Sequence, residues 1–264
     1  MNNSEIFIDP SKCLKDGICI NICPCQIFKP GTSGIPSVDA GLIKTCIKCG
    51  HCVSACPGDA ITVKALAKSD FKTGLAELPN FEVFANLVMS RRSVRVFKDK
   101  PVELDLLSNL IDMTRYCPTA KNTQTLSWLL VNGSDKVRKI SAQVIETFRS
   151  IDRMKPLVDA FDRGEDPVCR NAPQLAIVYG PEKYQWGTLD AAIAVANLEL
   201  AAKASGIGTC WGGFITSAAG SDKEIGRQLG LDDSEKIFAA LMIGYPRYQF
   251  RKVPPRNQLR LKVL

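Results

Sequence analysis

Histidine is almost missing from the sequence, and long apolar runs are missing altogether. His51 is the one histidine among 264 residues, so no Ser-His-Asp triad can be assembled. No segment approaches the roughly 18 uncharged apolar residues that would span a bilayer. The first residues, MNNSEIFIDPSKC, lack the basic-then-apolar pattern of a secretory signal. We therefore expect a cytoplasmic protein without a membrane partner.

Two further kinds of signal are absent. The second part of the chain has no G-x-G-x-x-G after a strand and no G-x-x-x-x-G-K-[ST], so neither a Rossmann nor a P-loop nucleotide site is indicated. The net charge of +7 is mild for this length, and no lysine or arginine block resembles a nucleic-acid-binding surface. We expect no nucleic-acid partner. The excess charge keeps the protein soluble, or part of it receives a phosphate or an acidic electron-transfer partner.

Cysteine, by contrast, is abundant and concentrated near the amino terminus. Eight of the eleven cysteines lie before residue 57. A reducing compartment disfavours disulfides and directs clustered thiols toward metal binding or redox chemistry. Residues 1–65 offer only short apolar runs broken by Gly, Pro and Cys, whereas ordinary α/β sequence begins near residue 81. The sequence predicts two domains, 1–67 and 81–264, joined by a linker at 68–80.

The cysteine spacing predicts iron–sulfur clusters. Residues 46–57, CIKCGHCVSACP, match the bacterial run in which three close thiolates bind one cubane and the fourth reaches a second cluster. An earlier copy, CLKDGICINICP, has the same offsets, with Asp16 in the second ligand position. Zinc would need separated cysteine pairs, so it explains the repeated triple spacing poorly. Residues 5–64 resemble the dicluster ferredoxin family.

That resemblance implies two ligand sets. One cluster would be held by Cys13, Asp16, Cys19 and Cys56, and the other by Cys46, Cys49, Cys52 and Cys23. A carboxylate is a harder ligand than a thiolate, so the iron at Asp16 would be weakly held, and its loss would leave a three-iron cluster. Cys25 is an alternative ligand there, although its position matches no site of the repeat. His51, between two ligand cysteines, would tune the cluster potential.

The second part of the chain predicts an α+β domain in which helices outnumber strands. Strands are expected at 128–131, 174–179 and 237–244. Helices are expected at 102–116, 134–148, 190–206 and 221–230. Ser134 and Asp190 are the expected N-caps of the second and third helices, and Ser221 with Glu224 forms a capping box in the fourth. The third helix is apolar nearly all round and should be buried.

An arginine-rich run, SRRSVRVF, follows an apolar helix-like segment containing Phe81, Phe84 and Val88. Such a run can grip a phosphate and the pyrimidine edge of a flavin through charge-assisted hydrogen bonds, although a solvated basic turn would look the same. A flavin is the natural acceptor for single electrons from iron–sulfur clusters. The run is followed in order by CPTAKNTQ (117–124), GIGTCWGGF (206–214) and IGYPRYQFRKVPPR (243–256). Residues 86–264 therefore resemble the nitroreductase-like flavoprotein family.

The family resemblance implies an FMN site at a homodimer interface, on a central mixed or antiparallel sheet flanked by helices. The FMN phosphate, ribityl chain and ring edge would be held by Arg91, Arg92, Ser93 and Arg95. The partner subunit would line the ring with Pro118, Thr119, Asn122 and Gln124, with Asn122 near flavin N5. Backbone amides of Trp211, Gly212 and Gly213 would approach the ring, and Arg256, or alternatively Arg251, would complete the phosphate site.

One motif departs from the family pattern. The family usually continues as Asn-x-Gln-Pro-Trp, whereas this chain reads NTQTLSW, so Thr125 and Leu126 alter the local shape of the substrate pocket. Among the residues outside the motifs, the tryptophans Trp128 and Trp186 are expected to pack in the core or at an interface. The remaining cysteines, Cys117, Cys169 and Cys210, are expected to be buried small apolar residues rather than nucleophiles.

These observations predict an FMN-dependent oxidoreductase. Single electrons would enter at the clusters, from a ferredoxin- or flavodoxin-like donor, and leave FMN as a hydride to a small nitro, quinone or activated-alkene substrate. Two alternatives remain open. One is a relay or redox sensor in which FMN passes electrons to a protein partner. The other is an NAD(P)H-fed reductase in which the clusters are the exit.

Overall fold

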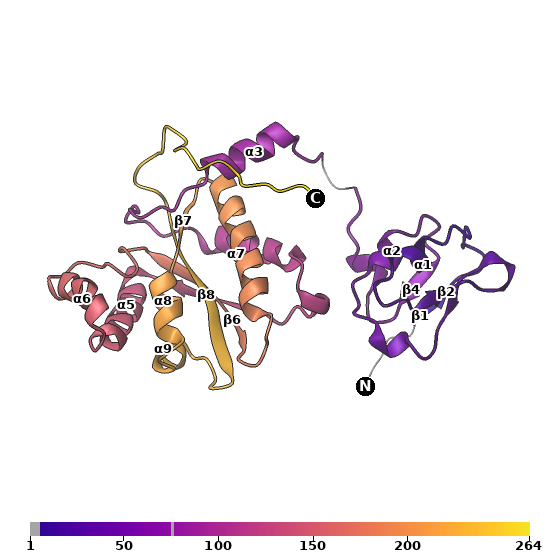
Figure 1. Ribbon diagram of the computed structural model, residues 1–264, viewed down its shortest axis with the longest axis horizontal. Coiled ribbons are helices and arrows are strands. Elements are labelled where there is room, and N and C mark those ends of the chain that lie inside the picture. The colour runs from indigo at the N-terminus through magenta and orange to yellow at the C-terminus, as the bar shows by residue number, and fades with distance from the viewer. Residues whose placement is uncertain (1–5, 75–76) are drawn as a thin grey trace. The chain divides into compact units, whose positions relative to one another are not determined.

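The computed structural model describes residues 6–74 and 77–264 and divides into two compact units (Figure 1). Unit 1 comprises Met1–Leu78 with Lys121–Thr123, and unit 2 comprises Pro79–Ala120 with Gln124–Leu264. The division at Leu78 and Pro79 falls inside the predicted linker 68–80. Residues 1–5 of the predicted first domain and residues 75–76 of the linker lie outside the description. In the described ranges, every helix is too short or too polar to cross a bilayer.

Unit 1 is built from two short antiparallel ribbons and two short helices. The elements are β1 (Ile6–Ile8), α1 (Ile18–Ile22), β2 (Phe28–Lys29), β3 (Ser37–Val38), α2 (His51–Ser54) and β4 (Ile61–Val63), with 3-10 turns η1 (Thr32–Gly34), η2 (Ile43–Thr45) and η3 (Lys68–Asp70). Strand β1 pairs with β4, and β2 pairs with β3. Ile27, Phe28 and Ile61 are almost fully buried at the centre of a small core. Half-buried cysteines pack around it.

The sequence repeat recurs in the backbone of unit 1. Lys15 and Lys48, which stand at the same place in the two cysteine runs, both adopt left-handed φ angles, 59° and 54°. Glycine precedes both helices and is left-handed as well, at 70° for Gly17 and 74° for Gly50. Both pairs are 33 residues apart (15 to 48 and 17 to 50). The two cysteine loops therefore share one main-chain turn, which a glycine adopts without the steric cost of a Cβ.

Unit 2 contains a four-stranded antiparallel sheet. Its strands are β5 (Ser127–Asn132), β6 (Gln174–Pro181), β7 (Gly208–Trp211) and β8 (Glu235–Gly244), in the order β5-β6-β8-β7. The three predicted strands are confirmed, and β7 was not predicted. Strand β7 has only four residues and begins with glycine, so it carries neither the length nor the apolar alternation of a strand signal.

Helices cover both faces of this sheet. They are α3 (Phe81–Ser90), α4 (Leu104–Met113), α5 (Ser134–Phe148), α6 (Lys155–Asp162), α7 (Gly187–Ala204), α8 (Gly213–Ala219) and α9 (Glu224–Gln228), with 3-10 turns η4 (Thr114–Tyr116), η5 (Ala120–Asn122) and η6 (Asp152–Met154). Leu175 and Ile177 of β6 join a core with α5 and α8, while Ala176 and Val178 join one with α4 and α7 (Figure 1). Successive strand residues thus face opposite layers.

The helix interiors follow the sequence prediction more closely than the helix ends. The predicted stripe of α5 is buried: Val137, Ile140, Val144 and Phe148. The predicted caps are wrong. Ser134 is the first helical residue, after Gly133, and Asp190 lies inside α7, which begins three residues earlier at Gly187. Helix α7 is also less buried than predicted, because Leu189 is 58% exposed.

The predicted capping box of α9 does not form. Ser221 donates its hydroxyl proton to the Ala218 carbonyl, 3.0 Å away, so it belongs to the end of α8. Asp222 accepts the Glu224 amide at 2.9 Å, just before the N-cap residue Lys223, whose own side chain forms no cap. The N-cap of α9 therefore lies two residues beyond the predicted serine cap.

The packing of α7 gives a stability prediction with a control on the same helix. Leu198 is fully buried, so Leu198→Ala should lower the free energy of unfolding by about 2–5 kcal/mol through lost burial and a cavity. Leu189→Ala, at an exposed position, should change it by about 0.5 kcal/mol or less. Urea denaturation followed by fluorescence measures both. Equal losses for the two variants would contradict the assigned faces of α7.

Candidate functional site

Unit 1 gathers the predicted second ligand set around one cavity. Four of its lining residues are the predicted ligands, and the fifth cysteine there is Cys25: Cys23, Cys25, Cys46, Cys49 and Cys52. All eleven cysteines of the chain are free thiols. Burial, with the neighbouring thiols Cys49 and Cys23 adding to it, raises the pKa of Cys52 to about 12. Buried sulfurs at this spacing hold their charge only when a cation shares it.

Three members of the predicted first set, Cys13, Asp16 and Cys19, lie near one another, and Asp16 also makes a main-chain contact. Burial raises the pKa of Cys19, and the nearby charges of Asp16 and Cys13 add to the effect, so the three side chains are neighbours. One carboxylate oxygen of Asp16 accepts the Ile18 amide at 3.0 Å, at the start of α1. Cys56 Sγ accepts the Ala60 amide at 3.3 Å. Ligation by Asp16 stays a prediction.

The donor types around the second cavity suit an iron–sulfur cluster. Five cysteines line this cavity, and thiolates are the ligands that such clusters take. The all-sulfur set therefore fits an iron–sulfur cluster.

In unit 2, main-chain pairing holds the arginine run against β7. The Val94 amide donates to the Thr209 carbonyl at 2.8 Å, and Ser93 forms a parallel bridge with Thr209. Gly208 permits this approach, because a Cβ there would lie 2.7 Å from a Val94 methyl group. The glycine of GIGTCWGGF is thus explained by close packing of two backbones. The first and third flavin motifs lie side by side.

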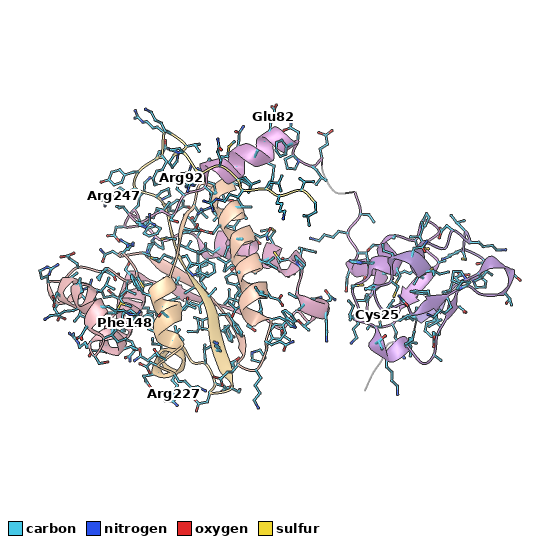
Figure 2. The ribbon with its side chains drawn as sticks, viewed as in Figure 1. Cys25, Glu82, Arg92, Phe148, Arg227 and Arg247 are labelled. Atoms are coloured by element: carbon cyan, nitrogen blue, oxygen red, sulfur yellow. The ribbon has the colours of Figure 1, made fainter. Side chains whose placement is uncertain are left out.

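The other end of the arginine run pairs with the fourth motif. The Lys98 amide donates to the Tyr245 carbonyl at 2.8 Å, and the Arg247 amide donates to the Val96 carbonyl at 3.0 Å. Figure 2 shows Arg92 and Arg247 at the end of unit 2 that carries α3. Three of the four motifs therefore meet in one place through backbone hydrogen bonds.

The arginines of the run have different electrostatic surroundings. Arg91 pairs with Glu199 at 3.2 Å, and Glu199 also accepts the Thr209 hydroxyl. Arg92 Nε is buried and has no hydrogen-bond acceptor among the described residues. An unsatisfied buried donor is costly, so this nitrogen fits a site that receives an acceptor from a ligand. Arg95 is exposed and lines an open cavity of about 820 Å³.

Three further arginines in that cavity were not predicted. Arg138, Arg170 and Arg247 line it together with Arg95 and Lys98. Four carboxylates line the same cavity, so its charge is mixed: Asp99, Asp135, Glu165 and Asp166. Arg170 and Asn171 both have left-handed φ angles, 55° and 53°. The Asp166 carboxylate holds this loop by accepting the Cys169 and Asn171 amides. Arg247 does lie inside the quoted fourth motif, whereas nothing in the local sequence around Arg170 indicates its position.

The second motif, 117–124, is anchored by a buried carboxylate. Both oxygens of Asp190 accept the Ala120 amide at 3.2 Å, and the Tyr184 hydroxyl donates to the same carboxylate. Thr119 and Gln124 line a cavity of about 300 Å³ with Asp190. Within unit 1, the Asn122 side chain donates to the carbonyls of Ile47 and Lys48, at 3.0 and 3.2 Å. A role for Asn122 beside flavin N5 stays a prediction, as does the role of Pro118.

Two predicted contacts look different in the structure. The Gly212 amide donates to the Ala240 carbonyl at 2.7 Å, so it serves the sheet, and a ring contact is left to Gly213 at the start of α8 and to Trp211. Arg251 and Arg256 are exposed in the C-terminal segment, where Arg256 donates to its neighbour Pro255. Arg247 lines the same cavity as Arg95, whereas the two predicted arginines, Arg251 and Arg256, do not line it.

The remaining cysteines and tryptophans largely follow expectation. Cys169 and Cys210 are buried, and burial raises the pKa of Cys169 to about 12, so its thiol is protonated and unreactive at neutral pH. Cys117 is half-buried. Trp128 packs against the α7 side of the sheet. Trp186 is 41% exposed at the start of α7 and is not a core residue.

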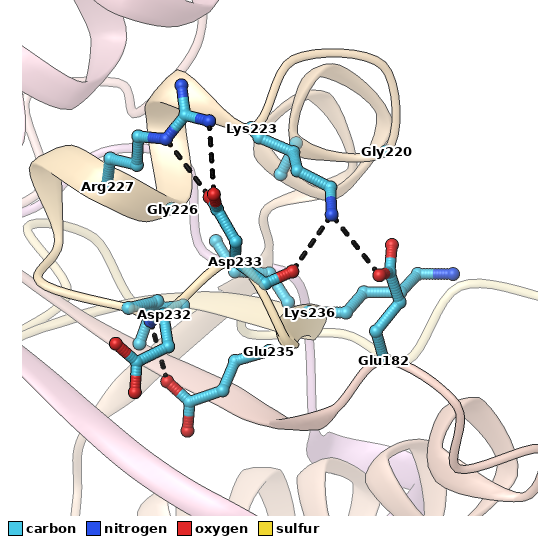
Figure 3. Close-up of a pocket in the computed structure, with 12 residues that line it drawn as sticks. Glu182, Gly220, Lys223, Gly226, Arg227, Asp232, Asp233, Glu235 and Lys236 are labelled. Carbon is cyan, nitrogen blue, oxygen red and sulfur yellow. Dashed lines mark hydrogen bonds and ion pairs between the residues drawn. The ribbon is translucent and has the colours of Figure 1, made fainter.

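A small cavity of about 100 Å³ lies elsewhere in unit 2, beside α9 and β8 (Figure 3). Four of its charged lining residues form two ion pairs. Lys223 contacts Glu182 at 3.2 Å, and Arg227 contacts Asp233 at 3.1 Å. None of the predicted site residues lines it. Ion pairs of this exposed kind tie a loop to a helix and contribute little stability.

The Asp190 contact gives a prediction about the second motif. Asp190→Ala removes the acceptor of the Ala120 amide, and a hydrogen bond to a charged group contributes about 1.5–3 kcal/mol. Amide hydrogen exchange across 118–124 should therefore accelerate by about 10- to 100-fold, as measured by mass spectrometry. Asp105→Ala, at an exposed position of α4, is the matched control and should leave that exchange unchanged. No acceleration in Asp190→Ala would show that the loop is fixed by other contacts.

Comparison with known proteins places both units. Residues 44–62 match the model of the 4Fe-4S binding domain. YfhC of Bacillus subtilis strain 168, whose name proposes an NAD(P)H nitroreductase, is 27% identical over 178 residues, covering 64% of this chain and 88% of that protein. The 4-nitrobenzoate reductase of Pseudomonas putida is 25% identical over 203 residues, covering 61% and 85%.

Solved structures show the same fold for unit 2. A nitroreductase with bound FMN from Bacteroides fragilis NCTC 9343 superposes with a TM-score of 0.58 at 23% identity, covering 68% of this chain and 97% of that one. A nitroreductase with bound FMN from Desulfitobacterium hafniense DCB-2 gives 0.57 at 19% identity, covering 66% and 93%. Residues 88–245, more than half of the sequence, match the nitroreductase family model, so the chain belongs to the nitroreductase family.

Proposed function

We propose that the protein is an FMN-dependent oxidoreductase that receives electrons singly through iron–sulfur clusters in unit 1 and reduces a small nitro, quinone or activated-alkene compound. The observation that carries the proposal is the backbone pairing that brings the arginine run beside β7 and the Tyr245–Arg247 segment. Family membership and the FMN named in the related structures support it. The five-cysteine cavity in the same chain supplies the route by which electrons enter.

The residues present fit FMN. FMN supplies the ability to accept single electrons and return them as a pair with a proton. Arg95, Arg170 and Arg247 line a cavity of a size typical for such ligands and would hold its phosphate. The buried Arg92 Nε would donate to a flavin oxygen, and Ser93 would orient the same edge. The guanidinium groups would also stabilise the negative charge of the reduced ring.

We also propose that the protein works as a homodimer. Helix α3 exposes apolar side chains that a monomer would leave in water, because Phe81 is 83% and Phe84 47% exposed, and Val88 is exposed as well. Exposed apolar surface of this extent is typical of an interaction site. In the partner arrangement, Pro118, Thr119, Asn122 and Gln124 would line the ring of the other subunit.

Anaerobic reoxidation separates the proposed enzyme from a relay. Reduced protein should be reoxidised rapidly by nitroaromatics, quinones or activated alkenes, because a reductase exposes its flavin to small substrates. A relay that serves only a protein partner would reoxidise slowly with all three. A second candidate, an NAD(P)H-fed reductase, is favoured by the name of the Bacillus subtilis relative. Bleaching of the flavin by NADH or NADPH in the absence of other donors would establish it.

The arginine cavity gives a prediction for flavin binding. Arg95→Gln removes one charged donor from the proposed phosphate site, so the FMN dissociation constant should rise by about 10- to 100-fold. The control is Arg149→Gln, at an exposed arginine that follows α5 and pairs with Asp162. It should leave the FMN dissociation constant unchanged. Fluorescence titration of apoprotein with FMN measures both. Equal dissociation constants for the two variants would show that Arg95 does not contribute to FMN binding.

A further inference from the structure

The cavity of the second ligand set contains one cysteine more than a cluster of four irons needs. The four predicted ligands there are Cys23, Cys46, Cys49 and Cys52, and Cys25 lines the same cavity. The repeat of 33 residues relates Cys23 to Cys56 and Cys25 to Gly58. The extra thiol therefore has a glycine as its counterpart at the first ligand set.

The contact around this position differs between the two copies. At Gly58, a Cβ would lie 2.2 Å from the Lys12 carbonyl oxygen, so that copy excludes any side chain. The equivalents of Gly58 and Lys12 are Cys25 and Thr45, each 33 residues away (25 to 58 and 12 to 45). Here the chain accommodates the side chain, and Cys25 Sγ donates to the Thr45 carbonyl at 3.0 Å. The two copies therefore differ at this contact: there is room for a thiol at Cys25 and no room for a side chain at Gly58.

The surroundings of Cys25 place its side chain at the edge of the ligand cavity. It is half-buried and packs against the small core of unit 1. It follows Cys23 by two residues, with Pro24 between them, and both side chains face one cavity. Its Sγ is hydrogen-bonded to the Thr45 carbonyl, so the thiol has a main-chain partner in this arrangement.

We propose that Cys25 is a reserve ligand of the second cluster, which takes over the iron corner of Cys23 when that thiolate is lost. The inference rests on the proposed iron–sulfur role of unit 1. In the exchange, the iron–sulfur bond to Cys23 breaks and one to Cys25 forms, while a proton passes from Cys25 to Cys23. No electron is gained or lost, so no oxidant is needed. The first cluster has no such reserve, because Gly58 stands at the equivalent position.

The repeat provides a matched control for the test. Cys23→Ala and Cys56→Ala remove equivalent ligands, one with a reserve thiol nearby and one without. Iron and acid-labile sulfide are measured in the full-length protein purified anaerobically, with the EPR spectrum after dithionite reduction. Cys23→Ala should keep the iron content of the unaltered protein, with shifted g-values for one cluster. Cys56→Ala should lose up to about half of the iron, and Cys23→Ala combined with Cys25→Ala should lose about half.

Alkylation gives a second readout that does not depend on cluster yield. Iodoacetamide should label Cys25 in the unaltered protein, because its thiol is partly exposed and binds no iron. In Cys23→Ala, labelling of Cys25 should fall by about tenfold or more, as measured by peptide mass spectrometry, because an iron-bound sulfur does not react.

The outcomes separate the inference from the function beneath it. If Cys23→Ala loses as much iron as the double variant, or if its Cys25 is labelled as in the unaltered protein, the reserve role is wrong while the cluster stands. If the unaltered protein itself binds no iron or sulfide, the proposed function of unit 1 fails, and the inference fails with it.

Discussion

The proposed flavin site depends on the backbone hydrogen bonds that fix Val94–Lys98 between two segments distant in sequence. Val94 bonds to Thr209 of β7, and Val96 and Lys98 bond to Arg247 and Tyr245 just after β8. Main-chain bonds hold this segment whatever its side chains do, so the guanidinium groups are left to bind a ligand. Gly208 matters to this pairing, because a Cβ there would lie 2.7 Å from a Val94 methyl group.

Unit 1 depends on a different constraint, the paired left-handed turns of its two cysteine loops. Lys15 with Gly17 and Lys48 with Gly50 bend the two loops in the same way, and the cysteines of the second loop line one cavity. Its apolar core is small, which leaves the cluster as a principal source of stability for a unit of this size. Burial and the neighbouring cysteines raise the pKa of the half-buried Cys52 thiol to about 12.

Sequence reasoning reached the parts of the structure that depend on local pattern. Apolar runs gave β5, β6 and β8, and cysteine spacing gave the ligand set around the second cavity. It missed β7, whose identity as a strand comes from pairing with β8 rather than from its four residues. It took Asp190 for a helix cap, whereas the carboxylate holds Ala120, 70 residues away in sequence. Contacts of that separation leave no local signal, and Arg170 was missed for the same reason.

The protein is proposed to store electrons in two kinds of cofactor on one chain, namely iron–sulfur clusters and a flavin. An anaerobic reductive titration of the purified protein, followed by visible absorbance, tests it most directly. Two clusters taking one electron each and one FMN taking two predict about four electrons per chain, with cluster and flavin absorbance both bleached. An end point at about two electrons with only the flavin bleached, or no bleaching at all, would contradict the account.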